Sequence, residues 1–359
     1  MKFKRLISAA VIGAAFAATS AFAFPDREIK VVVPFTAGGP TDVVARTMAE
    51  AMRKHLNSPV VVENLDGAGG TRGPSVVSKA KPDGHTVLIH HIGMSTAPAL
   101  YRKLPYNPMT DFEHIGLINE VPMTFVARKD FPAATMKEFI QVVKKDAKKW
   151  NLANAGLGAA SHLCGMLFQS ALDTDLTTVP YKGTGPAMTD LMGGQVDFMC
   201  DQTTNTTERI KAGSVKGYAV TTKTRLKTDG LSNLPTVAES GLPNFEVTVW
   251  HGLYAPKGTP KAALDKLNAA LNAALKDPEV IKRFEALGTG PVSPDKATAT
   301  YHAKFLQSQI DLWGPIIKKA GQCADGWLSA VVKKPRSCAA FLFESWHFPG
   351  QHQPSHRGI

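Results

Sequence analysis

The chain has 359 residues, of which 44% are hydrophobic and 8% aromatic, so it carries enough apolar material for two compact domains. Its formal net charge of +11 at pH 7 raises the question of a nucleic-acid partner. Three of these charges lie in the first five residues and a net two in residues 323–359, which leaves +6 for the body of the chain. The cations of the body are interspersed along polar helix faces, as in residues 137–149, so we expect no nucleic-acid partner, although a mildly basic body suits anionic ligands.

The N-terminus has the pattern of a cleavable export signal. A basic start is followed by an apolar stretch over residues 6–18, and Ala21-Phe22-Ala23 fits a small-x-small cleavage site. A membrane anchor is the alternative, but the apolar stretch is shorter than the roughly 20 residues that a spanning helix needs. We therefore expect cleavage after Ala23 and a soluble mature chain from Phe24 onward.

The four cysteines form no close-spaced metal or redox pattern, and the sequence contains no CxxC motif. Export to an oxidising compartment permits a disulfide without requiring one. Cys164 lies in an apolar helical pattern and Cys200 ends a strand pattern. We therefore expect both to be buried thiols and predict no structural disulfide in the body of the chain.

From residue 28 onward, short β-rich runs alternate with longer helical runs, and this alternation predicts parallel sheets covered by helices. Apolar residues recur at four-residue intervals in the first helical run, as a buried helix face requires. The first βαβαβ unit comprises strand 29–35, helix 43–56, strand 60–63, helix 73–80 and strand 86–90.

A second unit begins near Phe125. Its expected elements are helices 136–150, 161–172, 187–192 and 206–212 and strands 151–154, 177–180, 196–200 and 215–220. A strand-like, aromatic segment at residues 246–255 and two further helices, 260–275 and 278–287, follow it. Because the second unit is complete before this segment, we expect the segment to return to the first lobe.

The predicted fold class is α/β, with two lobes that each contain a mostly parallel sheet flanked by helices. The first lobe would comprise residues 24–124 and 246–320, and the second lobe residues 125–245. Two crossings between the lobes, at residues 120–125 and 242–249, would act as a hinge.

Residues 321–359 differ from the rest of the chain. Two of the four cysteines, two of the five tryptophans and three of the eleven histidines lie there, without helical or strand periodicity. We expect an atypical extension that is disordered or non-native and adds no domain. A small partner-binding tail is the alternative.

The first motif that carries chemistry joins the first strand to the first helix. Gly38 and Gly39 let the backbone approach a ligand closely, and the free N–H groups of the helix N-terminus favour an anion. Thr36 and Thr41 add hydroxyl donors. Asp42 either satisfies its own helix N-terminus or, beside an anion site, meets an ammonium group of the ligand. The full motif is Pro34-Phe35-Thr36-Ala37-Gly38-Gly39-Pro40-Thr41-Asp42.

Two further Gly-rich turns also follow predicted strands. Gly69 lies in the turn after the second strand, at the sheet edge where open α/β sheets bind ligands. Gly158, Ala160 and Ser161 belong to the corresponding turn of the second lobe. Ser161 is either a helix N-cap or a ligand contact.

The last polar turns lie further along the second unit. Lys182 and the amides from Gly183 through Thr184 to Gly185 suit a carboxylate, although Lys182 could instead be a solvated loop cation. Asp201 follows predicted strand 196–200. It could accept a hydrogen bond from an ammonium group or orient the neighbouring loops.

Enzyme signatures are missing from the sequence. It has no Gly-x-Ser-x-Gly, His-Glu-x-x-His or Gly-Lys-Ser/Thr motif. Gly156-x-Gly158 followed by Asp175 imitates a dinucleotide fingerprint, but Ser161 replaces its third glycine. His90 and His91 are adjacent in a predicted strand and point to opposite faces, which argues against a shared metal. We predict no catalytic residue, no metal and no cofactor.

With these motifs the chain resembles the Bug family, the extracytoplasmic binding receptors of tripartite tricarboxylate transporters. The resemblance covers about residues 24–320. The motifs that carry it are Val33-Pro34-Phe35 with Gly38-Gly39-x-x-Asp42, Gly67-x-Gly69-Gly70, Gly158 with Ser161-His162-Leu163, and Val179-Pro180-Tyr181-Lys182-Gly183 leading to Asp190-Leu191-Met192-Gly193-Gly194-Gln195-Val196-Asp197.

The resemblance implies a two-lobed Venus-flytrap receptor of the type II periplasmic class, which is not an enzyme. It implies a periplasmic protein, which we expect to be a monomer, that closes on a small carboxylate and delivers it to the membrane permease subunits of a transporter. A sensor that presents its closed state to a signalling receptor is the alternative. Dicarboxylates are slightly favoured over acidic amino acids, and aromatic carboxylates remain open.

The resemblance also implies that the carboxylate is held largely by backbone amides, hydroxyls and ordered water, with few direct charge pairs. The candidate ligand-binding residues are Phe35, Thr36, Gly38, Gly39, Thr41, Asp42, Gly69, Gly158, Ala160, Ser161, Lys182, Gly183, Thr184, Gly185 and Asp201.

Overall fold

The computed structural model describes residues 24–319. The expected signal segment 1–23 and the predicted extension 321–359 lie outside the described residues. The strands are β1 (Ile29–Val33), β2 (Val60–Asn64), β3 (Thr86–His91), β4 (Phe112–Ala127), β5 (Asn151–Asn154), β6 (Thr177–Pro180), β7 (Phe198–Gln202), β8 (Lys216–Val220), β9 (Thr248–Pro256) and β10 (Gly290–Pro291). The helices are α2 (Pro40–Leu56), α3 (Arg72–Val77), α4 (Gly93–Leu100), α5 (Met136–Lys145), α6 (Ala160–Leu172), α7 (Thr184–Met192), α8 (Thr203–Lys211), α9 (Lys261–Ala274), α10 (Pro278–Ala286) and α11 (Ala299–Lys319).

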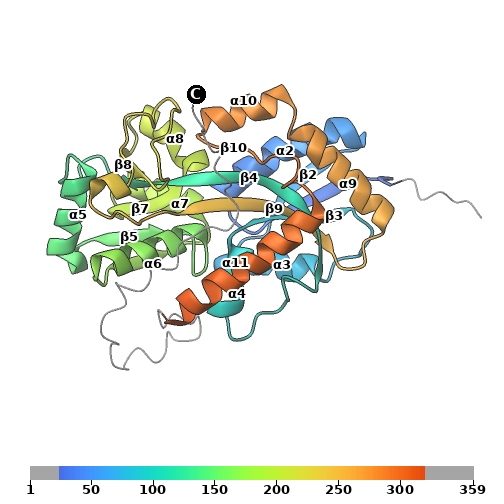
Figure 1. Cartoon of the computed structure of the whole chain (residues 1–359), viewed down its shortest axis with the longest axis horizontal. Helices are drawn as coiled ribbons and strands as arrows, with labels where there is room; N and C mark the ends of the chain where they lie inside the picture. The colour runs from blue at the N-terminus through green and yellow to red at the C-terminus, as the bar shows by residue number, and fades with distance from the viewer. Residues whose placement is uncertain (1–23, 320–359) are drawn as a thin grey trace, which may run out of the picture.

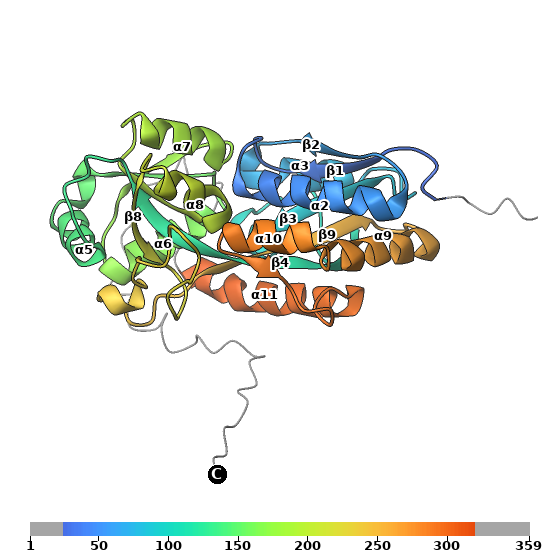
Figure 2. The same ribbon diagram turned by 90° about the horizontal axis from the view of Figure 1, so that it is seen from above.

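Two long strands, β4 and β9, run through the middle of the molecule between two lobes (Figure 1). The first lobe contains β1, β2, β3, β9 and the first part of β4, and the second lobe contains β5 to β8 and the last part of β4. Helices α2, α3, α9 and α11 lie on the first-lobe side, whereas α5 to α8 lie on the second-lobe side (Figure 2). The predicted two-lobed α/β fold is confirmed.

Each sheet is parallel in its outer part and antiparallel near the crossing strands. In the first lobe β1 pairs in parallel with β2 and β3, but β9 is antiparallel to both β3 and β4. In the second lobe β5 pairs in parallel with β6 and β7, but β4 is antiparallel to β7 and β8. The sheets are therefore mixed rather than mostly parallel. The reason is that β4 enters the second lobe, and β9 the first lobe, directly from the other lobe and not through a crossover helix.

The chain passes between the sheets at two points. Pro122 of β4 still pairs with Thr248 of β9 in the first lobe, whereas Met123 pairs with Gln202 of β7 in the second lobe. On the returning segment, the N–H of Val247 donates to the carbonyl of second-lobe residue Thr221 at 3.1 Å, one residue before β9 begins. Both passages fall within the predicted crossings, residues 120–125 and 242–249.

Helix α11 is an element that the sequence patterns did not reveal. Its buried residues are His302, Leu306, Gln309, Trp313 and Ile317, which recur every three to four residues as one helix face. Two of these five are polar, so a search for an apolar stripe misses the helix. Its neighbours in the fold are α4 and β4 of the first lobe.

Cys164 of α6 and Cys200 of β7 form a disulfide, which corrects the prediction of two separate buried thiols. The two residues are 36 positions apart in the sequence, but α6 packs on β7 and brings their Cα atoms to 6.1 Å. Sequence spacing carries no signal for this pair, because the bond depends on a helix docking on a strand. The disulfide ties α6 to β7.

No helix within residues 24–319 is long and apolar enough to cross a bilayer.

Candidate ligand-binding site

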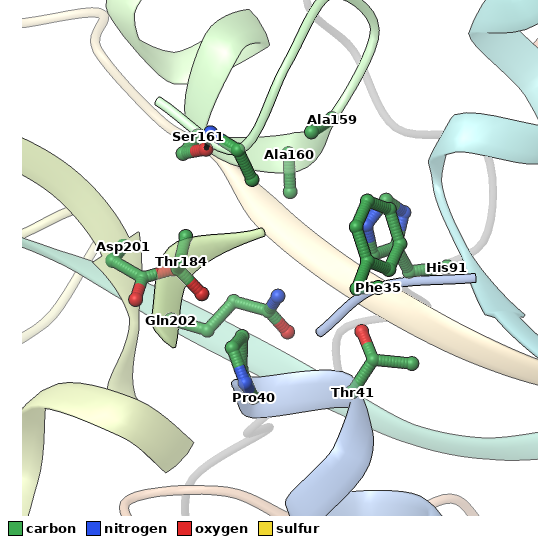
Figure 3. Close-up of a pocket in the computed structure, with 11 residues that line it drawn as sticks. Phe35, Pro40, Thr41, His91, Ala159, Ala160, Ser161, Thr184, Asp201 and Gln202 are labelled. Carbon is green, nitrogen blue, oxygen red and sulfur yellow. Dashed lines mark hydrogen bonds between the residues drawn. The ribbon is translucent and has the colours of Figure 1, made fainter. Parts of the chain in front are cut away.

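A small cavity lies between the two lobes. Figure 3 shows side chains from both lobes around this shared space. The residues that line it are Phe35, Pro40, Thr41 and His91 from the first lobe and Ala155, Ala159, Ala160, Ser161, Thr184, Asp201 and Gln202 from the second lobe.

The cavity brings together some of the predicted site residues and leaves others out. Those that line it are Phe35, Thr41, Ala160, Ser161, Thr184 and Asp201. Those that do not line it are Thr36, Gly38, Gly39, Asp42, Gly69, Gly158, Lys182, Gly183 and Gly185. Sequence reasoning missed His91, Ala155 and Gln202, whereas Pro40 and Ala159 lie within predicted ligand-binding turns without having been named individually.

Two of the missed residues could have been found from strand ends. His91 is the last residue of β3 and Gln202 the last residue of β7, each beyond the predicted end of its strand. The carboxyl ends of strands in open α/β sheets are where ligands bind, so correct strand ends would have pointed to both.

Four helices begin at this cavity. Helix α2 starts at Pro40 and Thr41, α6 starts at Ala160, and α7 starts at Thr184. Helix α8 starts directly after its N-cap residue Gln202. None of the four has a side-chain hydrogen bond that caps its N-terminus. The first N–H groups of a helix have no intrahelical partner and carry partial positive charge, so this cavity has an electropositive lining made of backbone.

No lysine or arginine contributes to that lining within the described chain. The only imidazole in it belongs to His91, and burial lowers the pKa of His91 to about 3. Its Nδ1 accepts a hydrogen bond from the N–H of Gly93 at 2.9 Å, and its ring stacks on Phe35 with a centroid separation of 4.7 Å. Any anion bound here would therefore be held by helix N-termini and hydroxyls rather than by a cationic side chain.

The second lobe also presents hydrogen-bond acceptors to the cavity. Oδ1 of Asp201 and Oε1 of Gln202 are buried and have no partner among the described residues. Oδ2 of Asp201 accepts from the side-chain amide of Asn205. Burial raises the pKa of Asp201 to about 6, although the hydrogen bonds from Asn205 and the backbone of Gln202 favour the carboxylate. The nearby Thr184 hydroxyl favours it too, without reaching hydrogen-bonding geometry.

Asp42 lies outside the cavity lining, and its oxygens are occupied by donors from its own helix, from the preceding loop and from β2. Oδ2 accepts from the Gly38 N–H and from Nε of Arg46, both at 2.9 Å, and Oδ1 accepts from Asn64 at 3.0 Å. Burial acts to raise the pKa of Asp42, but these three donors outweigh it, and the pKa is lowered overall. Asp42 thus closes the loop before α2. Lys182 is exposed and also lies away from the lining.

Two of the predicted glycines outside the lining, Gly69 and Gly183, lie where the two lobes contact each other. A Cβ atom at Gly69 would lie 1.9 Å from the Leu157 carbonyl oxygen, and a Cβ at Gly183 would lie 2.3 Å from Oγ1 of Thr36. The Tyr101 hydroxyl lies 2.8 Å from the same Leu157 carbonyl and 2.9 Å from that of Ala68. The glycines therefore permit backbone contact between closed lobes.

Among the described residues, no group of three or more His, Cys, Asp or Glu side chains is placed to hold a metal ion.

Comparison with known proteins agrees with this geometry. A model of the tripartite tricarboxylate transporter family receptor, TctC, matches residues 44–322. The structure is similar to that of the periplasmic binding protein BugD, with a TM-score of 0.81 and 52% identity over 83% of this chain and 99% of BugD. It is also similar to MatC from Rhodopseudomonas palustris with bound malate, with a TM-score of 0.78 and 41% identity over 82% of this chain and all of MatC.

A third neighbour is the R. palustris protein Rpa4515 with adipate, at a TM-score of 0.77 and 32% identity over 83% of this chain and 98% of that protein. The matching family and these neighbours are solute-binding proteins, which confirms the prediction that the chain is not an enzyme. Since the family match spans most of the sequence, the chain belongs to the TctC family of tripartite tricarboxylate transporter receptors, the Bug proteins.

Proposed function

We propose that this chain is a periplasmic receptor that binds a small carboxylate between its lobes and delivers it to the permease subunits of a tripartite tricarboxylate transporter. The observation that carries the proposal is that four helix N-termini from both lobes meet at one cavity without a lysine or arginine in its described lining. A carboxylate near a helix N-terminus gains about 0.3–1 kcal/mol at an exposed site and up to about 2 kcal/mol at a partly buried one. Several such ends acting together supply useful affinity for an anion.

The ligand closes the receptor because its contacts come from both lobes. Helix α2 belongs to the first lobe, and α6, α7 and α8 belong to the second, so a bound carboxylate reaches all of its donors only when the lobes are together. This differential affinity shifts the population toward the closed state. The passages through β4 and before β9 serve as the hinge, and the predicted lobe boundaries follow from them.

The ligand class is a dicarboxylate or an acidic amino acid. Two structural neighbours carry diacids, MatC with malate and Rpa4515 with adipate. The unpartnered oxygens of Asp201 and Gln202 give an ammonium or hydroxyl group of the ligand a place to donate a hydrogen bond.

A thermal-shift screen of purified, ligand-free protein tests the binding function. A ligand that binds only the native state raises the unfolding midpoint, so dicarboxylates, tricarboxylates, acidic amino acids and aromatic acids are compared at equal concentration. A shift of several degrees with one of the first three classes is expected. If folded protein responds to no carboxylate in the screen, the proposal is wrong.

Export and transport need separate measurements. N-terminal sequencing of protein from a periplasmic fraction is expected to begin at Phe24. Uptake of the labelled ligand by cells is expected to fall when the gene is deleted. Unchanged uptake, together with a changed transcriptional response to the ligand, would favour the sensor instead.

A further inference from the structure

A buried chain of hydrogen bonds leads from the cavity into the first lobe. Oγ1 of Thr41 lies 3.2 Å from Nε2 of His251, and Nδ1 of His251 lies 2.9 Å from Oδ1 of Asn119. The side-chain nitrogen of Asn119 donates to Oγ1 of Thr289 at 3.5 Å, and the Thr289 hydroxyl donates to the backbone carbonyl of Glu120 at 2.6 Å. Thr41, Asn119, His251 and Thr289 are all buried. The chain joins the start of α2 to β4, β9 and the residue before β10.

The donor and acceptor of every hydrogen bond in this series are determined by the last acceptor, the backbone carbonyl of Glu120. A backbone carbonyl can only accept, so the single hydroxyl hydrogen of Thr289 must point at Glu120. Oγ1 of Thr289 can then only accept, which turns the NH₂ group of Asn119 toward it. The Asn119 carbonyl oxygen consequently faces His251, and Nδ1 of His251 must carry the hydrogen that it accepts.

The same logic fixes the hydroxyl of Thr41. A neutral imidazole with its hydrogen on Nδ1 has a lone pair on Nε2, so Thr41 must donate to His251. His251 is completely buried, and that burial, together with the neighbouring His91, holds its pKa well below the ordinary value, in keeping with a neutral ring. With its only hydrogen committed to His251, Oγ1 of Thr41 has only lone pairs left for the cavity.

Acceptors therefore face the cavity from both lobes. Thr41 supplies one from the first lobe, while Oδ1 of Asp201 and Oε1 of Gln202 supply two from the second lobe. Donors come from the four helix N-termini and from the hydroxyls of Ser161 and Thr184, which also line the cavity. A ligand that consists of carboxylate groups alone satisfies those donors but leaves the side-chain acceptors unpaired, and an unpaired buried polar group is unfavourable.

We propose that Thr41, oriented by the chain of His251, Asn119 and Thr289, is a specificity-determining acceptor, so that the receptor selects carboxylates that also carry an O–H or N–H donor. The inference rests on the proposed function and names the substrate class of the same site: hydroxy or amino diacids in preference to plain diacids.

Isothermal titration at pH 7 with malate, aspartate and succinate tests this selection, because the three ligands share a four-carbon diacid skeleton and succinate alone lacks a donor. At least one of malate and aspartate is expected to bind about tenfold or more tightly than succinate, the scale set by leaving a buried acceptor unpaired. In Thr41→Val the ratio is expected to fall, because one of the three acceptors is lost, and in Thr41→Ser it is expected to persist. Melting temperatures show whether each variant is folded.

The failures of the two proposals are distinguishable in these data. If succinate binds as tightly as the donor-bearing ligands, or if Thr41→Val keeps the full preference, the inference is overturned while the carboxylate receptor stands. If no carboxylate binds to folded protein, the proposed function itself fails.

A second measurement needs no ligand. Long-range ¹H–¹⁵N spectra report which ring nitrogen of a histidine carries its hydrogen, and the His251 signal is the buried one that moves in Thr41→Ser. The hydrogen is expected on Nδ1. A hydrogen on Nε2 would reverse the bond to Thr41 and overturn the inference.

Discussion

Replacing Gly183 by alanine is expected to weaken ligand binding by hindering lobe closure. Gly183 is the residue before α7 and lies against Thr36 of the first lobe. Its φ of 166° is an extended backbone conformation that any residue adopts, so alanine introduces no strain within the second lobe. The added methyl group meets an obstacle only when the lobes are together.

The size of that obstacle follows from the closed geometry. A Cβ atom at residue 183 would lie 2.3 Å from Oγ1 and 3.0 Å from the backbone nitrogen of Thr36. Rotation of the Thr36 side chain relieves the first contact but not the second. Overpacking of this kind costs about 1–3 kcal/mol. Because 1.4 kcal/mol is a factor of ten in an equilibrium constant, the dissociation constant should rise about 5- to 150-fold.

Isothermal titration with the ligand identified in the screen measures this change, and Gly193→Ala is the matched control in the same lobe. Gly193 has a φ of −81°, and a Cβ there would lie no closer than 3.4 Å to its nearest neighbour, which is ordinary contact. Gly183→Ala should lose affinity while the melting temperature of the ligand-free protein stays near that of wild type. Equal affinity in Gly183→Ala, Gly193→Ala and wild type would refute closure against Thr36.

Three further predictions concern the site and its support. Because the pKa of Asp201 is raised from 3.8 to about 6 in the folded protein, its ionisation opposes folding at pH 7, and this cost disappears as the pH falls through 6 toward 3.8. Asp201→Asn should therefore stabilise the ligand-free protein at pH 7, by up to about 3 kcal/mol. Thermal melts of variant and wild type at pH 7, 6, 5 and 4 should show this stability difference shrinking as the pH falls. A stability difference that stays constant with pH would contradict the raised pKa. Replacing both Cys164 and Cys200 by alanine should lower the free energy of unfolding, measured in urea, by about 2–4 kcal/mol, as expected for a disulfide between residues 36 positions apart. A loss below about 0.5 kcal/mol would contradict a stabilising disulfide. Tyr101→Phe removes a hydroxyl that donates a hydrogen bond to the Leu157 carbonyl of the other lobe. The dissociation constant of the ligand should therefore rise about 2- to 13-fold, with little change in the melting temperature of the ligand-free protein. Unchanged affinity would show that this hydrogen bond does not stabilise the closed lobes.

Local sequence patterns identified the elements that build the site. Strand, Gly-rich turn and helix start follow one another closely in the chain, so turn residues such as Gly38, Thr41 and Gly158 and the helix start at Ser161 are visible without a structure. The same reasoning predicted two crossings between the lobes, because a completed βαβ unit must be left before another begins. It could not show that β4 and β9 are antiparallel, since strand direction depends on where the chain returns.

The roles of individual side chains depended on tertiary contacts. The sequence left Asp42 open between a ligand contact and a helix terminus, and only the position of Asn64 on β2 and Arg46 on α2 shows that its oxygens are already occupied. Gly69 and Gly183 looked like ligand-binding glycines, but their close neighbours are Leu157 and Thr36 of the opposite lobe.

The sequence by itself thus determined the α/β class, the two-lobed order of the chain and the turns that present helix N-termini, because these follow from residues close together in the chain. The tertiary structure decided which residues face the cavity, the pairing of Cys164 with Cys200, and the bond between Thr41 and His251. That last bond joins residues 210 positions apart. Contacts over such separations arise only when the returning strand β9 packs beside the first lobe, and no local pattern specifies them.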